Sequence, residues 1–267
     1  MSGAHDVRIV LCGATGRTGN AVAHALAAAE PGLLAGLVAP SIATNPSRSL
    51  PTGVPAFASL EEALPAADGP VVVVDLSHAD PALHHMRIAL DARCALVVGA
   101  TGIADEDLET WGERFAAAEL GLLHVPNFSI GAVLAMRVAT ELVAYLPDVE
   151  IVETHHDGKR DAPSGTAILA ARRLAAARRD AGVVPGPGSA SAGAGHGRGE
   201  SVDGIPVHAL RLPGASAHQE IVFGGTGELV SIRHDAVDRS CYAAGVALAA
   251  RRVGTLRGLR TGLEHVL

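Results

Sequence analysis

The stretch that decides the fold is Val7-Arg-Ile-Val-Leu-Cys-Gly13-Ala-Thr-Gly16-Arg-Thr-Gly19, near the start of a 267-residue chain. An apolar run ends at a glycine turn, after which Ala, Val and Leu recur at helical spacing. In such a GxxGxxG loop, Gly13 permits a tight turn, Gly16 lets backbone amides approach a pyrophosphate, and Gly19 lets a helix pack closely on the strand. An ordinary strand–helix turn with spare glycines would show the same letters. The position after the first strand of a repeating pattern favours dinucleotide binding.

Strand-like and helix-like segments continue to alternate through the first 125 residues. Val71–Asp75 and Ala95–Val98 are too apolar to have a wet face, which is typical of a parallel sheet covered on both sides. We therefore predict an α/β fold whose N-terminal domain is a Rossmann-like, doubly wound parallel sheet.

The pattern changes after Pro126 and predicts a second, smaller α+β domain. We expect helices over residues 132–145 and 166–179, a strand over 150–155, and half-buried antiparallel strands over 205–211, 220–223 and 228–234. A Gly/Ala/Ser/Pro-rich loop covers residues 182–199, and an Ala-rich helix over 239–252 closes the chain and packs back on the first domain. The predicted domains are residues 1–126 plus 238–267, and residues 127–237.

The composition excludes several classes of protein. Aromatic residues make up only 3% and the net charge is -7, so a nucleic-acid-binding protein is not expected. The N-terminus lacks a signal-peptide pattern, and no apolar run approaches the roughly 20 residues that span a bilayer. Cys12, Cys94 and Cys241 form no CxxC pair, so neither a disulfide framework nor a zinc knuckle is indicated. The sequence is typical of a soluble cytoplasmic protein.

Lysine is almost absent: Lys159 is the single lysine among 21 basic residues. A biased codon pool explains the excess of Arg, and one remaining Lys can be chance. A lysine that persists against such a background also suits a position that needs a compact, rotatable ammonium instead of a guanidinium.

Lys159 belongs to a polar cluster that runs from Glu153 to Ala167 and turns abruptly into a helix. Pro163 and Ser164 suit the first turn of that helix, with Ser164 as its cap and the free amides around Ser164–Thr166 as an anion site. Two histidines and the lysine just ahead of it offer proton donors and a cation beside a bound carboxylate. Surface histidines and a solvated lysine are the alternative for each residue taken singly.

No metal site is predicted in this cluster. His155 and His156 point to different sides of an extended segment, and neither an HExxH motif nor a cysteine partner is present. The other histidine pair, His84-His85, lies in a helix predicted over residues 81–92, where we expect it to face solvent.

The motif from Glu153 to Ala167 reads ExHHxxKxDAPSGTA, and with it the sequence closely resembles the dihydrodipicolinate reductase (4-hydroxy-tetrahydrodipicolinate reductase) family. That stretch is the signature of the family. Further segments that look like the family run most of the chain: Gly13–Gly19, Asp75–Ser77, Gly99–Gly102, Pro126–Gly131, Val207–Gly214, His218–Phe223 and Ile232–Asp235.

The resemblance implies an enzyme of bacterial lysine and diaminopimelate synthesis that transfers a hydride from NADH or NADPH to a cyclic imine dicarboxylate, giving tetrahydrodipicolinate. By the resemblance, His155 and Lys159 are the proton donors, and His156, Gly165 and Thr166 contact the substrate carboxylates. The resemblance also implies a homotetramer assembled through the sheets of the second domain, which binds the substrate. The expected cofactor-binding residues are Gly13, Ala14, Thr15, Gly16, Arg17, Thr18, Gly99, Ala100, Thr101, Pro126, Asn127, Phe128 and Ser129.

The sequence departs from the family pattern at the adenosine end of the cofactor site. The second strand runs into Ala39-Pro40, where an acid that binds the ribose hydroxyls and disfavours a 2′-phosphate is expected. Ser41, Thr44, Ser47 and Arg48 are candidate contacts for such a phosphate. The sequence therefore favours NADPH slightly over NADH, with use of both left open.

Alternatives remain. Milder departures at Leu76-Ser77 and Ala100 suit a related imine reductase of a specialised-metabolite pathway, although the unchanged signature favours the lysine-pathway substrate. A non-catalytic dinucleotide-binding redox sensor has no use for the cluster around Lys159. A short-chain dehydrogenase is excluded, because neither Tyr145 nor Tyr242 has Lys four residues on.

Overall fold

The structure, a computed structural model, describes residues 7–44, 49–186 and 197–267. The chain divides into two compact units, Met1–Ile130 with Arg239–Leu267, and Gly131–Asp238. Ser47 and Arg48, two of the candidate phosphate contacts, lie outside the described residues, as does most of the loop predicted over residues 182–199.

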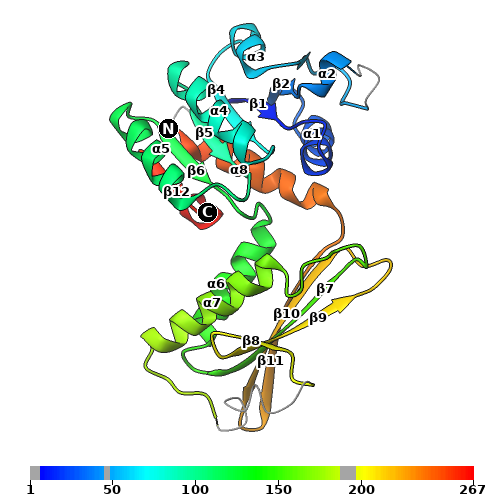
Figure 1. The fold of residues 1–267 in the computed structure, drawn as a ribbon, viewed down its shortest axis with the longest axis vertical. Helices are drawn as coiled ribbons and strands as arrows, with labels where there is room; N and C mark the ends of the chain where they lie inside the picture. Colours follow the sequence, from blue (N-terminus) through cyan, green and yellow to red (C-terminus); the bar gives the residue numbers. More distant parts are fainter. Residues whose placement is uncertain (1–6, 45–48, 187–196) are drawn as a thin grey trace. The chain divides into compact units, whose positions relative to one another are not determined.

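The first unit is built on a seven-stranded sheet in the order β12-β6-β5-β4-β1-β2-β3 (Figure 1). Every pairing in it is parallel. The strand order reverses between β1 and β4, which makes the sheet doubly wound and confirms the predicted Rossmann-like fold. The strands are β1 (Arg8–Cys12), β2 (Leu34–Val38), β3 (Ala56–Phe57), β4 (Val71–Asp75), β5 (Ala95–Val98), β6 (Gly121–His124) and β12 (Gly258–Thr261).

Helices cover both faces of this sheet because its strands are apolar on both sides. One face packs on α3 (Leu60–Ala66), α4 (Ala79–Asp91) and α5 (Asp105–Ala117). The other packs on α1 (Arg17–Ala29) and α8 (Ala243–Val253), so the helix after the second unit returns to the first sheet. The short elements of this unit are α2 (Ser41–Thr44), η1 (Arg239–Tyr242) and η2 (Leu263–Val266).

The end of the chain differs from the prediction. We expected a helix to close the chain, but after α8 the residues form β12, which pairs with β6 at the edge of the sheet. A strand of four residues, two of them Arg and Thr, is too short to show a period in sequence.

The second unit contains a five-stranded sheet in the order β11-β10-β7-β9-β8 (Figure 1). Two helices pack on one face of it, through residues of α6, α7 and the strands that form one apolar cluster. Along β7 the inward residues alternate with outward ones, so Val149, Ile151 and Glu153 are buried. The elements are α6 (Ile130–Leu142), β7 (Asp148–His155), α7 (Gly165–Asp180), β8 (Glu200–Val202), β9 (Ile205–Arg211), β10 (Ala217–Gly225) and β11 (Glu228–Ala236).

The smaller α+β domain is therefore as predicted in class, but one strand direction was wrong. β9 runs parallel to β7, whereas β10 pairs antiparallel with both β7 and β11. The reason is the connection: α7 carries the chain back across the sheet between β7 and β9, as a crossover to a parallel strand requires. Among the described residues, no helix is long and apolar enough to cross a membrane.

Candidate active site

Glu153 organises the polar cluster of the second unit. Its side chain has no exposed surface, because it is an inward position of β7. His155 donates its Nδ1 hydrogen to Oε2, and the backbone N–H of Ser164 donates to Oε1 at 3.1 Å. A buried carboxylate needs such donors to remain ionised. This arrangement fixes the His155 ring and leaves its Nε2 as the nitrogen that can serve a ligand.

Arg211 supplies the counter-charge. It lies opposite His155 at the end of β9, and its Nη1 and Nη2 reach the two oxygens of Glu153 at 2.9 and 2.8 Å. Nη2 also donates to the backbone carbonyl of Asp161 at 2.6 Å, which ties the loop after β7 to the sheet. The sequence analysis missed Arg211. The available signal was its position at the end of a strand, but the register with His155 follows only from the parallel pairing.

The protonation states follow from these contacts. Burial alone would raise the pKa of Glu153, but hydrogen bonds from Arg211, His155 and the Ser164 amide outweigh it and hold that pKa below its usual value. Burial lowers the pKa of His155, and the nearby charges of Lys159 and Arg211 lower it further, against the raising effect of Glu153. An imidazolium at this position is therefore a stronger acid than an ordinary one.

Lys159 lies in a turn after β7, where its N–H donates to the carbonyl of His156 at 3.1 Å. Its Nζ contacts both carboxylate oxygens of Asp161, at 2.8 and 2.7 Å. These hydrogen bonds lower the pKa of Asp161. The lysine side chain is 22% exposed, so the ammonium stays within reach of a ligand while a carboxylate partner holds it.

Ser164 is the N-cap of α7, as the sequence predicts, and its Oγ accepts from the N–H of Ala167 at 3.2 Å. The expected anion site is smaller than predicted, because the Ser164 amide is already bound to Glu153. Gly165 and Thr166 are exposed, and the described residues give their N–H groups no hydrogen-bond partner. These two amides lie at the N-terminus of α7, which is the positive end of the helix dipole, and they suit a substrate carboxylate.

The glycine loop of the first unit has the geometry of a phosphate cradle. Gly13 has φ +78°, and a Cβ there would lie 2.7 Å from the Leu76 backbone. A Cβ on Gly19 would lie 2.2 Å from the Gly13 carbonyl, so the helix and the loop pack as closely as the motif implies. α1 begins after Gly16, and no side chain of the described residues caps it, which leaves the amides of its first turn for a phosphate. The residues present therefore fit a dinucleotide.

The other predicted cofactor residues lie at the carboxyl edge of the same sheet. Gly99–Thr101 follow β5 and Pro126–Ser129 follow β6, neighbours in the sheet. A Cβ on Gly99 would lie 2.6 Å from the Phe128 ring, so the two segments touch. Thr15 shares a 2.8 Å hydrogen bond with Ser41, which brings the glycine loop to the end of β2. Ala14 is buried, Arg17 is exposed and Thr18 lies between these extremes.

The structure thus gathers the predicted residues into two sets, one in each unit. The cofactor set lies in the first unit, and His155, His156, Lys159, Gly165 and Thr166 lie together in the second. His156, which follows the last residue of β7, is partly exposed.

The expectation for the pair His84-His85 was half wrong. The His84 side chain is 52% exposed and bonds Glu61 at the surface, but that of His85 is 14% exposed and donates to the buried carboxylate of Asp75. The helical period explains the difference, because adjacent residues of α4 face directions about 100° apart.

Cys12, Asp75 and His85 place possible metal ligands within 4.8 Å of one another. Burial, and then the charge of Asp75, raises the pKa of the Cys12 thiol well above its usual value, whereas a metal binds the thiolate. The Asp75 oxygens already accept hydrogen bonds from Ser77 and His85. The three residues fit a hydrogen-bonded core better than a metal site.

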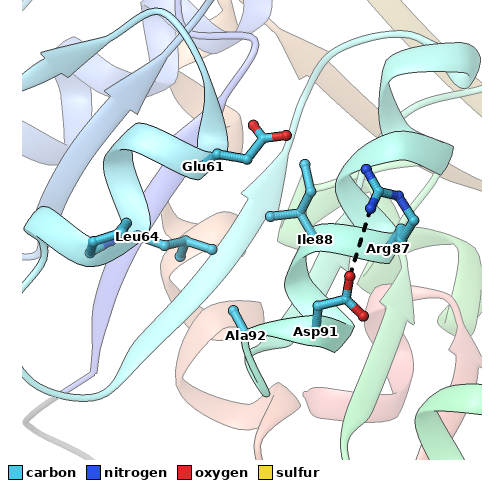
Figure 2. Close-up of a pocket in the computed structure, with 7 residues that line it drawn as sticks. Glu61, Leu64, Arg87, Ile88, Asp91 and Ala92 are labelled. Carbon is cyan, nitrogen blue, oxygen red and sulfur yellow. Dashed lines mark ion pairs between the residues drawn. The ribbon is translucent and has the colours of Figure 1, made fainter.

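A cavity of about 300 Å³ lies between α3 and α4 (Figure 2). Arg87 and Asp91 form an ion pair on its wall, 3.8 Å apart. None of the predicted site residues lines this cavity. The part of α4 that faces it is partly exposed. The lining residues are Glu61, Leu64, Pro65, Arg87, Ile88, Asp91 and Ala92.

Comparisons with known proteins show the family of the chain. The family model described as dihydrodipicolinate reductase, N-terminus, matches residues 7–128, and the one described as dihydrodipicolinate reductase, C-terminus, matches residues 131–267. The chain is 40% identical over 264 residues to the 4-hydroxy-tetrahydrodipicolinate reductase of Moorella thermoacetica, with 98% of each chain covered. It is 39% identical over 282 residues to that of Synechococcus elongatus, with 99% of this chain and 100% of the relative covered.

A solved structure shows the same architecture. The dipicolinate-bound dihydrodipicolinate reductase from Paenisporosarcina sp. TG-14 superposes with a TM-score of 0.85 at 35% identity, covering 98% of this chain and 100% of that one.

Proposed function

Because the chain belongs to the dihydrodipicolinate reductase family, we propose that it acts on the lysine-pathway imine through the cluster around Glu153. It is an oxidoreductase that uses a hydride from NAD(P)H and a proton to convert 4-hydroxy-tetrahydrodipicolinate to tetrahydrodipicolinate, with the 4-hydroxyl leaving as water, in lysine and diaminopimelate biosynthesis. The observation that supports the substrate class is a group of hydrogen-bond donors in one segment: Lys159, His155 and the amides of Gly165 and Thr166. The solved relative with bound dipicolinate, a cyclic dicarboxylate, supports the same class.

We assign proton donation to His155 and Lys159. The reduced cofactor, when bound, supplies a hydride to the conjugated imine, and the ring then carries negative charge that a proton must neutralise. Glu153 holds the His155 ring by Nδ1, so a proton on Nε2 is the one it can donate. Lys159 contributes a compact ammonium that stabilises the developing charge, and it is the second group placed to donate that proton. His156 and the amides of Gly165 and Thr166 bind the two carboxylates.

We assign the dinucleotide to the carboxyl edge of the first sheet. The pyrophosphate lies against the loop Gly13–Thr18, and the nicotinamide side is lined by Gly99–Thr101 and Pro126–Ser129. These assignments rest on the close packing of the glycine loop and on the contact of Gly99 with Phe128. The first unit is thus the dinucleotide-binding domain, and the second binds the substrate.

For the choice between cofactors, we propose a modest preference for NADPH. β2 ends at Val38 and is followed by Ala39-Pro40, so no carboxylate there repels a 2′-phosphate. The hydroxyls of Thr15 and Ser41 lie at this end of β2, bonded to each other, and can turn to a phosphate.

We further propose a homotetramer in the cytoplasm. Among the described residues of the second unit, no helix packs on the outward face of the five-stranded sheet (Figure 1), which leaves this face for association with other copies. Cys12, Cys94 and Cys241 form no disulfide, as is typical of a protein in a reducing compartment.

The test is steady-state kinetics on enzymatically generated 4-hydroxy-tetrahydrodipicolinate, with NADH and NADPH in parallel. We expect turnover with both and a higher kcat/KM with NADPH. Binding of either dinucleotide without turnover would instead support a redox sensor. A kcat/KM that is higher with NADH than with NADPH would overturn the cofactor proposal.

A further inference from the structure

A buried carboxylate lies at the carboxyl edge of the first sheet, where the cofactor is assigned. It belongs to a residue that has no role in the assignments above. Asp75 ends β4 and has no exposed surface. Its Oδ1 accepts from the backbone N–H of Ser77 at 2.8 Å and from the Ser77 hydroxyl at 2.6 Å. The carboxylate thereby fixes the Leu76–Ser77 turn that leaves the strand.

Within the described parts of the chain, the second oxygen of this carboxylate has one donor, His85. The Nδ1 of His85 in α4 donates to Oδ2 of Asp75, ten residues earlier in the chain. A buried carboxylate oxygen without a donor raises the free energy of the folded state. Loss of the His85 donor would therefore drive the carboxylate to rotate toward other donors or water. Rotation of that carboxylate would also disturb its bonds to Ser77.

The turn that Asp75 holds touches both cofactor loops. A Cβ on Gly13 would lie 2.7 Å from the carbonyl carbon of Leu76 and 2.8 Å from the Ser77 nitrogen, so the glycine loop rests on the turn. On the other side, Leu76 Cδ2 would lie 2.8 Å from a Cβ on Gly99. Gly99 also donates its N–H to the Asp75 carbonyl at 2.7 Å, and Leu76 donates to the Cys12 carbonyl at 3.0 Å. β4 lies between β1 and β5, which explains why one turn meets both loops.

We propose that His85 is a positioning residue for the dinucleotide: through Asp75 it holds the Leu76–Ser77 turn against the loops at Gly13 and Gly99. The inference rests on the proposed function, because those loops are assigned to the cofactor there. His85 touches neither cofactor nor substrate in this account. It acts by keeping the carboxylate oriented, and the spacing of the two loops depends on that orientation.

The test compares three variants by titration calorimetry with NADPH and NADH. His85→Leu keeps similar bulk but removes the donor, whereas His85→Asn places an amide N–H close to the position of Nδ1. His84→Leu is the matched control, since His84 is the neighbour of His85 on the same helix and bonds Glu61 at the surface. We expect His85→Leu to raise the dinucleotide Kd about tenfold, and His85→Asn and His84→Leu to stay within about threefold of wild type.

Michaelis constants distinguish a positioning role for the dinucleotide from a general loss of structure, which would affect both substrates. In His85→Leu, we expect KM for the dinucleotide to rise with its Kd, and KM for the imine to stay within about twofold. Wild-type dinucleotide affinity in a folded His85→Leu protein would overturn the proposal. So would an equal loss in His85→Asn, because packing and not the hydrogen bond would then be responsible.

Two further outcomes are distinguishable. If His85→Leu does not fold, the variant Ser77→Ala replaces it, because it removes the hydroxyl that donates to Asp75 Oδ1. We expect Ser77→Ala to raise the dinucleotide Kd about threefold. An unchanged Kd would contradict the proposal. Calorimetry does not require turnover, so a wild-type protein that binds dinucleotide but does not reduce the imine would refute the substrate assignment alone. A wild-type protein that binds no dinucleotide would refute both.

Discussion

At the scale of single residues, the surroundings of Glu153 were predictable from the sequence only where they are close to it along the chain. The sequence places Glu153, His155 and Lys159 in one segment, and from that spacing proton donors beside a carboxylate site are predictable. Arg211, 58 residues away, is the counter-charge that lets Glu153 be ionised without exposed surface. Its partner depends on the pairing of β7 with β9, which no local pattern records.

Glu153→Gln tests how that carboxylate affects His155. Glu153 raises the pKa of His155 against burial, so its removal lowers that pKa further below the usual value. If protonated His155 is the donor, kcat/KM falls as pH rises through its pKa, and the variant's decline therefore begins at a lower pH. NMR titration of the His155 ring gives the pKa directly. An unchanged or higher pKa would contradict the contact.

Arg211→Met tests the counter-charge. It keeps an apolar stem but leaves Glu153 buried with a single cationic partner at most, and breaking a buried pair in this way costs about 3–5 kcal/mol. The free energy of unfolding from urea denaturation measures it. The double variant Glu153→Gln with Arg211→Met recovers part of that loss, because the unpaired charge is gone. A cost under about 1 kcal/mol for Arg211→Met would place the pair among weak surface ion pairs.

At the scale of elements, strongly periodic segments were predictable and connections less so. The helix cap at Ser164 was evident from Pro163-Ser164, because capping depends on adjacent residues. The strand β12 was missed, and β9 was expected to be antiparallel. Both errors concern partners, which are set by the whole chain and not by its local composition. The same applies to His85, whose burial depends on which side of α4 meets the sheet.

Ser164→Ala tests the cap. It removes the hydroxyl that accepts from the Ala167 N–H, and we expect a loss of about 1 kcal/mol in the free energy of unfolding. The control Thr52→Ala, at an exposed turn position of the first unit, changes stability by less than about 0.5 kcal/mol. Equal effects of the two substitutions on urea denaturation would show that the cap contributes nothing special.

At the scale of the whole molecule, the alternation of strands and helices predicted the doubly wound sheet, and the change after Pro126 predicted a second unit. Assembly is different, since an interface between copies follows from surface shape that a single sequence does not display. The tetramer therefore remains a proposal that needs its own measurement.

Light scattering coupled to size-exclusion chromatography provides that measurement. A homotetramer has four times the 27.0 kDa mass of the chain. If the outward face of the second sheet forms the interface, Val222→Arg on β10 should shift the mass to smaller species, because a buried like-charge cluster opposes association. A wild-type mass of one or two chains would contradict the tetramer.

We assign the chemistry to the segment around Lys159, and the variant Lys159→Arg is the sharpest test of that assignment. The guanidinium keeps the charge and can still pair with Asp161, but it is larger and planar and does not give up a proton, so it cannot replace the ammonium as a proton donor. The adjacent exposed residue provides a matched control, Arg160→Lys. Measured by steady-state reduction of 4-hydroxy-tetrahydrodipicolinate, Lys159→Arg should lose most of kcat while the dinucleotide Kd and the Arg160→Lys variant stay at wild-type values. Wild-type turnover in Lys159→Arg would contradict the role of the lysine.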